Sequence, residues 1–289
     1  MRWGFVGLGQ MGLPMARRLA GAVELVAHDR RGRDLDGLRT APAIADLAGC
    51  GTVVLCLPGA AAVEAVLFGA DGLADRLPEG ATVVDASTTS HAAAVRTGER
   101  LAGRGIGFLD APVSGMRARA EEGTLTMMAG GEAALLERLR GPLSAIASRI
   151  LHVGPVGAGQ LAKLVNQLLF DVNMAALAEI LPIAARQGLD PDQVAEIVNS
   201  GTGRSYASEF FLPNILGGVF DRGYPMAAAY KDLVAGAELT AANGFPAPVL
   251  AAATATYQQA LAEGFGHQDK GAMIKVYERL VGTTFRSRA

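Results

Sequence analysis

Short apolar runs alternate with segments of helical periodicity through the first half of the chain. The runs are rich in Val, Leu, Ile and Phe and lie at residues 2–7, 23–29, 52–57, 81–85, 106–109, 125–129 and 150–153. Apolar runs of this length, separated by helical patterns, are typical of parallel βαβ units rather than of a β-sandwich. The pattern therefore predicts an α/β domain built on a parallel sheet.

After Gly159 the pattern changes, because every later segment has helical periodicity. Residues 160–187 are apolar almost all round, which is typical of a buried helix, and we expect this helix to lie between two domains. Asp190 followed by Pro191 suits the start of the next helix. The pattern predicts an α/β domain at 1–157 and an all-helical domain at 158–289, with further helices at 191–199, 226–242, 248–263 and 270–281 and a frayed tail at 284–289.

Composition and charge narrow the class of protein. Half of the residues are apolar, which excludes a disordered chain, and 26 basic against 28 acidic residues argue against a nucleic-acid partner. No uninterrupted apolar run approaches the length of a membrane span, so we expect no membrane partner. The amino-terminal residues argue against a secretory leader, and we expect Cys50 and Cys56 to be reduced, so the sequence favours a cytoplasmic location. The four histidines are scattered, so we expect no metal site.

A glycine turn, GLGQMG at residues 7–12, follows the first apolar run directly and opens a helical stretch. In a dinucleotide site Gly7 permits the tight turn, Gly9 lets backbone approach a pyrophosphate, and Gly12 allows the helix to pack on the strand. An ordinary glycine turn is the alternative, but Asp29 ends the second run 22 residues after Gly7, as such a site requires. The spacing predicts a Rossmann-like dinucleotide-binding domain with cofactor contacts from Gly7, Leu8, Gly9, Gln10, Met11, Gly12 and Asp29.

The residues after the second run bear on the choice between NAD and NADP. A carboxylate at Asp29 accepts hydrogen bonds from both ribose hydroxyls and repels a 2′-phosphate, which favours NAD. Arg30 and Arg31 leave NADP open, because a guanidinium there pairs with a phosphate or stacks on the adenine. A solvated basic loop is the third interpretation. We expect NAD, with Arg30 among the cofactor contacts.

Three motifs carry a resemblance to a known family. The stretch GLGQMGLPMA at residues 7–16 resembles the amino-terminal signature of the β-hydroxyacid dehydrogenases, DAPVSG at 110–115 resembles their substrate segment, and GAGQLAKLVNQ at 157–167 resembles their catalytic segment. This family includes 3-hydroxyisobutyrate dehydrogenase and 2-hydroxy-3-oxopropionate reductase and is related to 6-phosphogluconate dehydrogenase. The order of the motifs spans the whole chain, so the resemblance implies both the fold and the reaction class.

Lys163 stands out in the long helix independently of the resemblance. At helical spacing it shares one side with Asn166, Gln167, Phe170 and Asn173, while the other positions are mostly apolar. Polar groups on a buried helix need a polar partner, and a substrate cleft would supply one. The alternative is a lysine that extends to solvent. The resemblance implies that Lys163 is the general acid/base at the substrate oxygen, with Asn166 or Gln167 as its hydrogen-bonding neighbour.

The substrate carboxylate is expected at the second motif. Ser114, Gly115 and the amide of residue 116 offer a hydroxyl and backbone donors after a strand, which suits an anion, although an ordinary turn is the alternative. Met116 departs from the family pattern, which has a second glycine there, and this leaves the substrate's identity open. Arg117 and Arg119 either supply a cation to the carboxylate or face solvent.

Further cofactor contacts come from the resemblance alone. It implies contacts from Leu57 and Pro58 after the third run, from Thr88 after the fourth, and from Lys231 in the helical half. Lys231 with Asp232 also fits a solvated helical pair.

Together these features predict an NAD(P)-dependent oxidoreductase that interconverts a small β-hydroxy acid and its oxo acid. An imine-reducing relative on the same fold is one alternative, although such relatives generally replace the position of Lys163. A dinucleotide-binding sensor without turnover is another, because fold does not establish function. The apolar helical half exceeds what it can bury alone, and the resemblance implies a homodimer or homotetramer.

Overall fold

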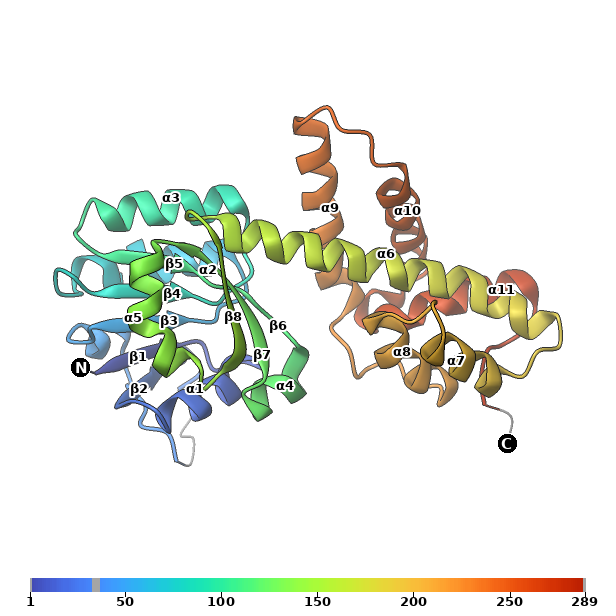
Figure 1. The fold of residues 1–289 in the computed structure, drawn as a ribbon, viewed down its shortest axis with the longest axis horizontal. Helices are drawn as coiled ribbons and strands as arrows, with labels where there is room; N and C mark the ends of the chain where they lie inside the picture. The colour runs from blue at the N-terminus through green and yellow to red at the C-terminus, as the bar shows by residue number, and fades with distance from the viewer. Residues whose placement is uncertain (1, 33–36, 288–289) are drawn as a thin grey trace. The chain divides into compact units, whose positions relative to one another are not determined.

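The structure is a computed structural model that describes residues 2–32 and 37–287. The chain divides into two compact units, Met1–Lys163 and Leu164–Ala289. The first is an α/β unit around one sheet, and the second is helical and follows from a long helix, α6 (Ala158–Arg186), which begins in the first unit (Figure 1). The predicted fold class is confirmed.

One eight-stranded sheet forms the α/β unit, in the order β2-β1-β3-β4-β5-β7-β6, with β8 paired to β7. Its strands are β1 (Trp3–Val6), β2 (Leu25–His28), β3 (Thr52–Leu55), β4 (Thr82–Asp85), β5 (Gly107–Asp110), β6 (Val113–Ser114), β7 (Leu125–Gly131) and β8 (Ala147–Gly154). The first five strands are parallel, as predicted, but β7 runs antiparallel to β5. Strand β8 is parallel to β7, so it is reversed as well. The sheet is therefore mixed, and the expectation of a wholly parallel sheet is wrong at β7 and β8.

Helices cover both faces of this sheet (Figure 1). Side chains of α1 (Gly12–Ala20), α4 (Met116–Glu122) and α5 (Ala133–Leu143) share one core cluster with Val84 of β4. Those of α2 (Ala60–Phe68) and α3 (His91–Ala102) share a second cluster with Val83, the preceding residue. Neighbouring strand residues point to opposite faces, so a strand buried on both sides reads as a continuous apolar run.

The register of the parallel strands places their carboxyl ends together. Val6 pairs with His28 on one side and with Leu55 on the other, and Leu55, Asp85 and Asp110 continue the same row across the sheet. The loops that follow these residues therefore share one edge, which is where ligands bind in open α/β sheets.

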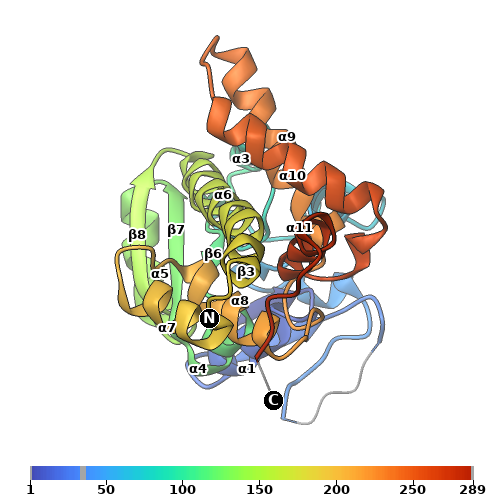
Figure 2. The same ribbon diagram turned by 90° about the vertical axis from the view of Figure 1, so that its right-hand side faces the viewer.

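The helical unit has a core of its own. Its further helices are α7 (Pro191–Ser200), α8 (Tyr206–Leu216), α9 (Met226–Ala242), α10 (Pro248–Ala262) and α11 (Ile274–Val281). Helices α9 and α10 lie side by side (Figure 2). As predicted, the Asp190 side chain caps α7 by accepting hydrogen bonds from two of its first amides. Helix α8 was not predicted, although Ser205 caps it in the same manner.

The carboxyl-terminal segment corrects one expectation. Phe285 is fully buried, its N–H donates to Glu278 Oε1 at 2.8 Å, and the N–H of Ser287 donates to Leu216 O at 3.1 Å. Residues 284–287 are therefore packed rather than frayed, because an aromatic side chain and a buried carboxylate hold them. The rest of the predicted tail lies outside the described residues.

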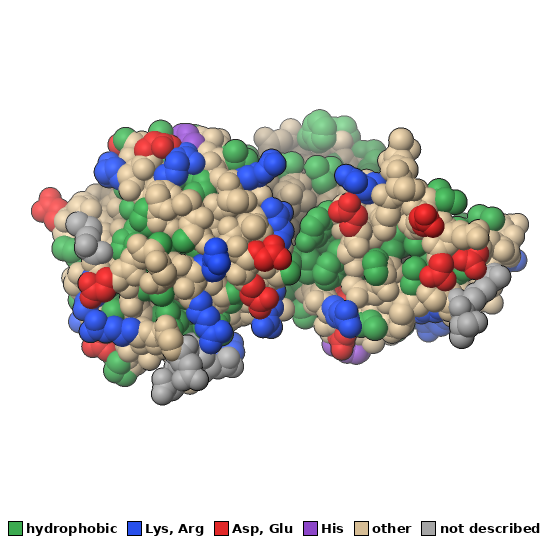
Figure 3. Space-filling model, turned by 60° about the horizontal axis from the view of Figure 1, so that its bottom comes forward, with side chains coloured by type: hydrophobic (Ala, Val, Ile, Leu, Met, Phe, Trp, Pro, Cys, Tyr) green, Lys and Arg blue, Asp and Glu red, His purple; other side chains and the backbone are tan. Residues whose placement is uncertain are grey.

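Helix α6 is less buried than its composition predicts. Val165, Leu169, Ile180 and Ile183 are between 48% and 63% exposed, and their spacings of 4, 11 and 3 residues place them on one face. The expectation of burial all round is wrong for this stripe. Figure 3 shows apolar, basic and acidic side chains interspersed on the surface of both units.

Candidate active site

The glycine turn has the geometry that a dinucleotide requires. Gly7 has φ +100°, and a Cβ there would lie 2.3 Å from the carbonyl oxygen of Cys56, while a Cβ on Gly12 would lie 1.9 Å from that of Gly7. A Cβ on Gly9 would meet nothing within 4 Å. Gly7 and Gly12 thus permit close packing, and Gly9 presents open backbone to a ligand at the start of α1. The turn fits a pyrophosphate.

Asp29, directly after β2, lies against this turn. One oxygen of its carboxylate accepts a hydrogen bond from the N–H of Leu8 at 2.8 Å, and the other accepts one from the N–H of Arg31 at 2.9 Å. These bonds hold the carboxylate at the turn, as a ribose-binding acid requires. The side chains of Arg30 and Arg31 are exposed.

The other two predicted cofactor segments share the same edge of the sheet. The N–H of Leu57 donates to Ser87 Oγ at 2.9 Å, and the N–H of Ser87 donates to Asp85 Oδ1 at 2.9 Å. Burial raises the pKa of Asp85 to about 7. Ser87 thereby connects the Leu57–Pro58 segment to the segment that carries Thr88.

The predicted substrate segment follows β5 and includes β6. Ser114 pairs with Thr126 of β7 and is half-buried, and Gly115 is buried. Met116 has φ +60°, and it is the one non-glycine residue with a positive φ among residues 2–32 and 37–287. Methionine therefore occupies a left-handed backbone conformation that glycine adopts more readily, at the position where the family pattern has glycine.

Lys163 lies near the start of α6, and its side chain is buried, with the residue 8% exposed. It does not extend to solvent. The first turn of α6 is attached to the sheet, because the Asp110 carboxylate accepts hydrogen bonds from the N–H groups of Gly157 at 2.7 Å and Gln160 at 2.9 Å. Burial raises the pKa of Asp110, although these amides act in the opposite direction. Lys163 is thus carried by a helix whose first turn is fixed at the carboxyl edge.

The remaining predicted residues lie in the helical unit. Asn166 is exposed, and Gln167 donates to Asp232 Oδ2 on α9 at 3.2 Å. Lys231 is the exposed neighbour of Asp232, so the contact of Gln167 brings the helix of Lys231 against α6.

Asp110, Gln160 and Asp232 were not predicted as site residues. Asp110 closes a buried strand in the same register as Asp85, and an acidic residue at that point of an apolar run was the available signal. Gln160 and Asp232 acquire partners only through tertiary contacts, which periodicity does not reveal.

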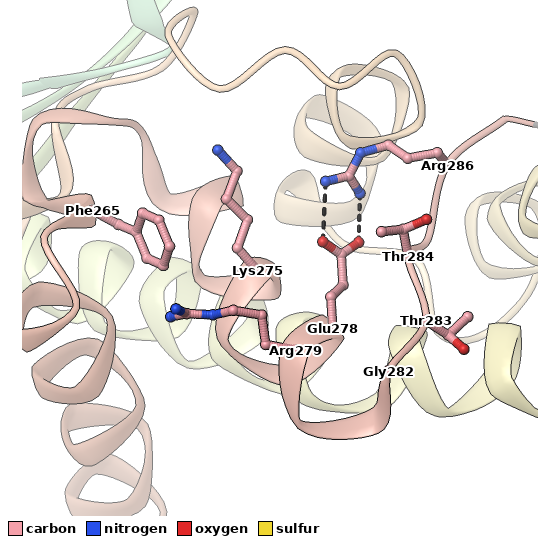
Figure 4. Close-up of a pocket in the computed structure, with 8 residues that line it drawn as sticks. All are labelled: Phe265, Lys275, Glu278, Arg279, Gly282, Thr283, Thr284 and Arg286. Carbon is pink, nitrogen blue, oxygen red and sulfur yellow. Dashed lines mark hydrogen bonds and ion pairs between the residues drawn. The ribbon is translucent and has the colours of Figure 1, made fainter.

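The helical unit also has a pocket of about 730 Å³ beside α11 (Figure 4). Its lining is basic and polar with one aromatic ring, and comprises Phe265, Lys275, Glu278, Arg279, Gly282, Thr283, Thr284 and Arg286. Glu278 and Arg286 form an ion pair across it, as the dashed lines in Figure 4 show. None of the predicted site residues lines this pocket.

A strand, glycine turn and helix, with an acid at the end of the second strand, define a dinucleotide-binding α/β protein. Comparisons with known proteins agree. Residues 2–154 match the NAD binding domain of 6-phosphogluconate dehydrogenase, and residues 157–277 match the family described as NAD-binding of NADP-dependent 3-hydroxyisobutyrate dehydrogenase.

Similar proteins span the full chain. The 2-(hydroxymethyl)glutarate dehydrogenase of Eubacterium barkeri is 36% identical, over 97% of this chain and 96% of that protein. The NAD-dependent L-serine dehydrogenase of Pseudomonas aeruginosa is 32% identical, over 96% and 98%. The crystal structure of 3-hydroxyisobutyrate dehydrogenase from Salmonella typhimurium is 31% identical with a TM-score of 0.85, over 96% and 99%.

The chain belongs to the 3-hydroxyisobutyrate dehydrogenase-like β-hydroxyacid dehydrogenases, with an NAD-binding domain of the 6-phosphogluconate dehydrogenase type. It is an NAD(P)-dependent dehydrogenase that acts on hydroxy acids. These relatives are named for different substrates, so membership of the family does not identify the hydroxy acid on which this enzyme acts.

Proposed function

We propose that this enzyme interconverts a small β-hydroxy acid and its semialdehyde, with Lys163 as the general acid/base. The observation that carries the proposal is the burial of Lys163 on a helix whose first turn is bonded to the sheet edge that holds the glycine turn. Oxidation of an alcohol releases a proton as well as a hydride, and a nicotinamide held at the glycine turn would supply the hydride acceptor. A buried amine at the substrate oxygen would take up that proton and return it in the reverse direction.

The substrate carboxylate is assigned to the segment at Ser114. The Ser114 hydroxyl and the backbone N–H of Met116 follow a strand, and such donors form an anion-binding concavity. The Met116 side chain adds apolar volume where the family pattern has hydrogen alone. We infer that the acid carries a short substituent that the methionine contacts.

For the cofactor we propose NAD. The Asp29 carboxylate is held at the glycine turn by the N–H of Leu8, where a 2′-phosphate would meet its charge. The NAD-dependent serine dehydrogenase of P. aeruginosa is a relative with the same preference in its name. Gly7, Gly9, Gly12, Leu57, Pro58, Thr88 and Lys231 complete the proposed cofactor contacts, together with Leu8, Gln10, Met11 and Arg30.

For the partner we propose a second copy of this chain, packed on the exposed stripe of α6. By length and composition α6 is also apolar enough to cross a membrane. However, Asp171 on α6 is fully buried and ion-paired with Lys270 inside the helical unit, which suits a protein environment rather than lipid. Sedimentation velocity should show a dimer or larger species that Leu169→Asp dissociates, and a wild-type monomer would contradict the proposal.

Two other functions remain as alternatives. An imine-reducing relative would turn over imines rather than hydroxy acids, and a sensor would bind the dinucleotide without turnover. The presence of both Lys163 and Ser114 favours the dehydrogenase.

A cofactor-absorbance assay across small hydroxy acids tests the proposal. The panel includes 3-hydroxyisobutyrate, 2-(hydroxymethyl)glutarate, L-threonate and L-serine, each with NAD and with NADP. Wild type should reduce the cofactor with at least one acid. Lys163→Ala should lower kcat by about 10²- to 10⁴-fold, the usual contribution of a general acid/base, while cofactor affinity changes little. Near-normal turnover in Lys163→Ala would falsify the assignment.

A further inference from the structure

The Gln160 side chain forms an unusual pair of bonds with the α/β unit. Gln160 is 2% exposed. Its Nε2 donates to the carbonyl oxygen of Ser87 at 2.8 Å, and its Oε1 accepts from the N–H of Thr89 at 2.9 Å. The amide thus pairs with the backbone on both sides of Thr88, and both of its polar atoms are satisfied despite burial.

The backbone of Gln160 is fixed as well. Its N–H donates to Asp110 Oδ2 at 2.9 Å, and a Cβ on the preceding Gly159 would lie 2.3 Å from the carbonyl oxygen of Met128. Glycine at 159 therefore lets α6 approach the sheet closely. The side chain and the main chain of one residue attach the helix to the ends of β4 and β5.

Two elements of the proposed site meet at this residue. Lys163 follows Gln160 by three residues and so lies on the same side of α6. We call the two side-chain bonds of Gln160, to Ser87 O and from the N–H of Thr89, the clamp. The Ser87 hydroxyl also accepts a hydrogen bond from the N–H of Leu57, so the segment held by the clamp in turn holds the Leu57–Pro58 loop. Gln160, which makes the clamp, and Lys163, which carries the amine, are therefore about one helical turn apart on α6.

We propose that Gln160 is a positioning residue that fixes the Thr88 segment, and the cofactor held there, at a set distance from Lys163. The inference rests on the proposed roles of Thr88 and Lys163. Without the clamp, the backbone groups of Ser87 and Thr89 lose their hydrogen bonds to the Gln160 side chain. The distance between the Thr88 segment and the Lys163 amine then varies. Misplacement by about 1 Å lowers the rate of a chemical step by about 10²-fold, whereas binding of the carboxylate at Ser114 does not depend on it.

The test uses Gln160→Met, which keeps the length of the side chain and removes both bonds, beside Gln259→Met on the exposed face of α10. We expect kcat to fall about 10²-fold in Gln160→Met while KM for the acid stays within about threefold. Hydrogen exchange of the cofactor-free protein should be at least about tenfold faster at the Thr89 amide and unchanged at the Ala86 amide, which bonds to Leu55 O. Gln259→Met should match wild type in both measurements.

A second variant, Gln160→Glu, keeps the inference testable if Gln160→Met does not fold. In Gln160→Glu a protonated carboxyl can still donate to Ser87 O and accept from Thr89, but the ionised form cannot donate. Its kcat relative to wild type should therefore rise as pH falls.

The outcomes separate this inference from the proposed function. A kcat within twofold of wild type in Gln160→Met, or unchanged Thr89 exchange, overturns the positioning role, as does a pH-independent ratio for Gln160→Glu. Retention of turnover in Lys163→Ala overturns the proposed function instead, and the exchange at Thr89 still reports the clamp.

Discussion

Asp171 on α6 and Lys270 near the start of α11 form an ion pair inside the helical unit, with 0% and 3% of their side chains exposed. The Tyr257 hydroxyl donates to the same carboxylate oxygen, Oδ1, at 3.2 Å. The other oxygen is buried and has no hydrogen-bond partner within the described part of the chain. Burial raises the pKa of Asp171 even though Lys270 acts against it. Within the described part of the chain, Lys270 is therefore the cation that compensates the charge of this buried carboxylate.

Removal of that cation should destabilise the protein strongly. We expect Lys270→Met to lower the free energy of unfolding by about 3–5 kcal/mol, because it leaves a buried charge without compensation. The double variant Asp171→Leu with Lys270→Met should recover most of the loss. Denaturant unfolding of the three proteins measures both effects. Arg117→Gln is the control, since its pair with Glu121 is exposed, and it should cost less than about 1 kcal/mol. Equal losses in the buried and exposed pairs would contradict the interpretation.

The second prediction concerns cofactor choice at Asp29. Asp29→Ser removes the charge that opposes a 2′-phosphate and leaves Arg30 and Arg31 to attract one. We expect the ratio of kcat/KM for NADP to that for NAD to rise at least about tenfold, a change of about 1.4 kcal/mol. Glu24→Gln, which alters an exposed acid just before β2, should leave the ratio unchanged. A wild-type preference for NADP would favour the arginines as the determinant.

The third prediction follows from the left-handed backbone at residue 116. Met116→Gly should raise the free energy of unfolding by about 1 kcal/mol, because a Cβ is unfavourable at φ +60° and glycine relieves it. Thermal or denaturant unfolding measures the change. Ala118→Gly, in the right-handed part of the same helix, should instead cost about 1 kcal/mol. If both glycine variants lose stability, residue 116 is not strained.

The sequence predicts strands better than it predicts the contacts of the site. Buried parallel strands read as apolar runs, so β1 to β5 are confirmed, whereas β6 has two residues and no detectable period. Helix α8 contains Pro213, which reads as a helix breaker, yet the helix continues through it. Motif residues such as Gly7 and Asp29 were predictable because their spacing follows from local geometry. Gln160 was not, because its partners lie 71 and 73 residues away.

The packed carboxyl-terminal segment gives the fourth prediction. A frayed tail would leave the Phe285 side chain exposed to solvent. In the structure this side chain is fully buried. Phe285→Ala should therefore lower the free energy of unfolding by about 3–5 kcal/mol, the usual cost of removing a buried aromatic side chain. Phe245, which is 67% exposed, supplies the control, and Phe245→Ala should change stability by less than about 0.5 kcal/mol. Equal effects of the two substitutions on stability would support a frayed tail instead.

The fifth prediction is a pH dependence that originates at Asp85. Burial raises the pKa of this carboxyl from 3.8 to about 7 in the folded protein, so the folded state keeps a proton that the unfolded state releases. Between these two values the unfolded state binds fewer protons, and the stability of the folded protein therefore falls as pH rises. The loss from this group ends above about pH 7 and amounts to at most about 4 kcal/mol.

Asp85→Asn keeps an oxygen that accepts the N–H of Ser87 but does not titrate. The free energy of unfolding of Asp85→Asn minus that of wild type should therefore increase as pH rises from about 4 to about 7. Above about pH 7 this difference should stay constant. Denaturant unfolding of both proteins at several pH values measures this difference. Asp71→Asn, at an exposed carboxylate, controls for the loss of one acidic group. Because Asp110 is also buried and remains in the variant, Asp85→Asn should retain a smaller fall of the same sign, and parallel curves for the variant and wild type would exclude Asp85 as the source.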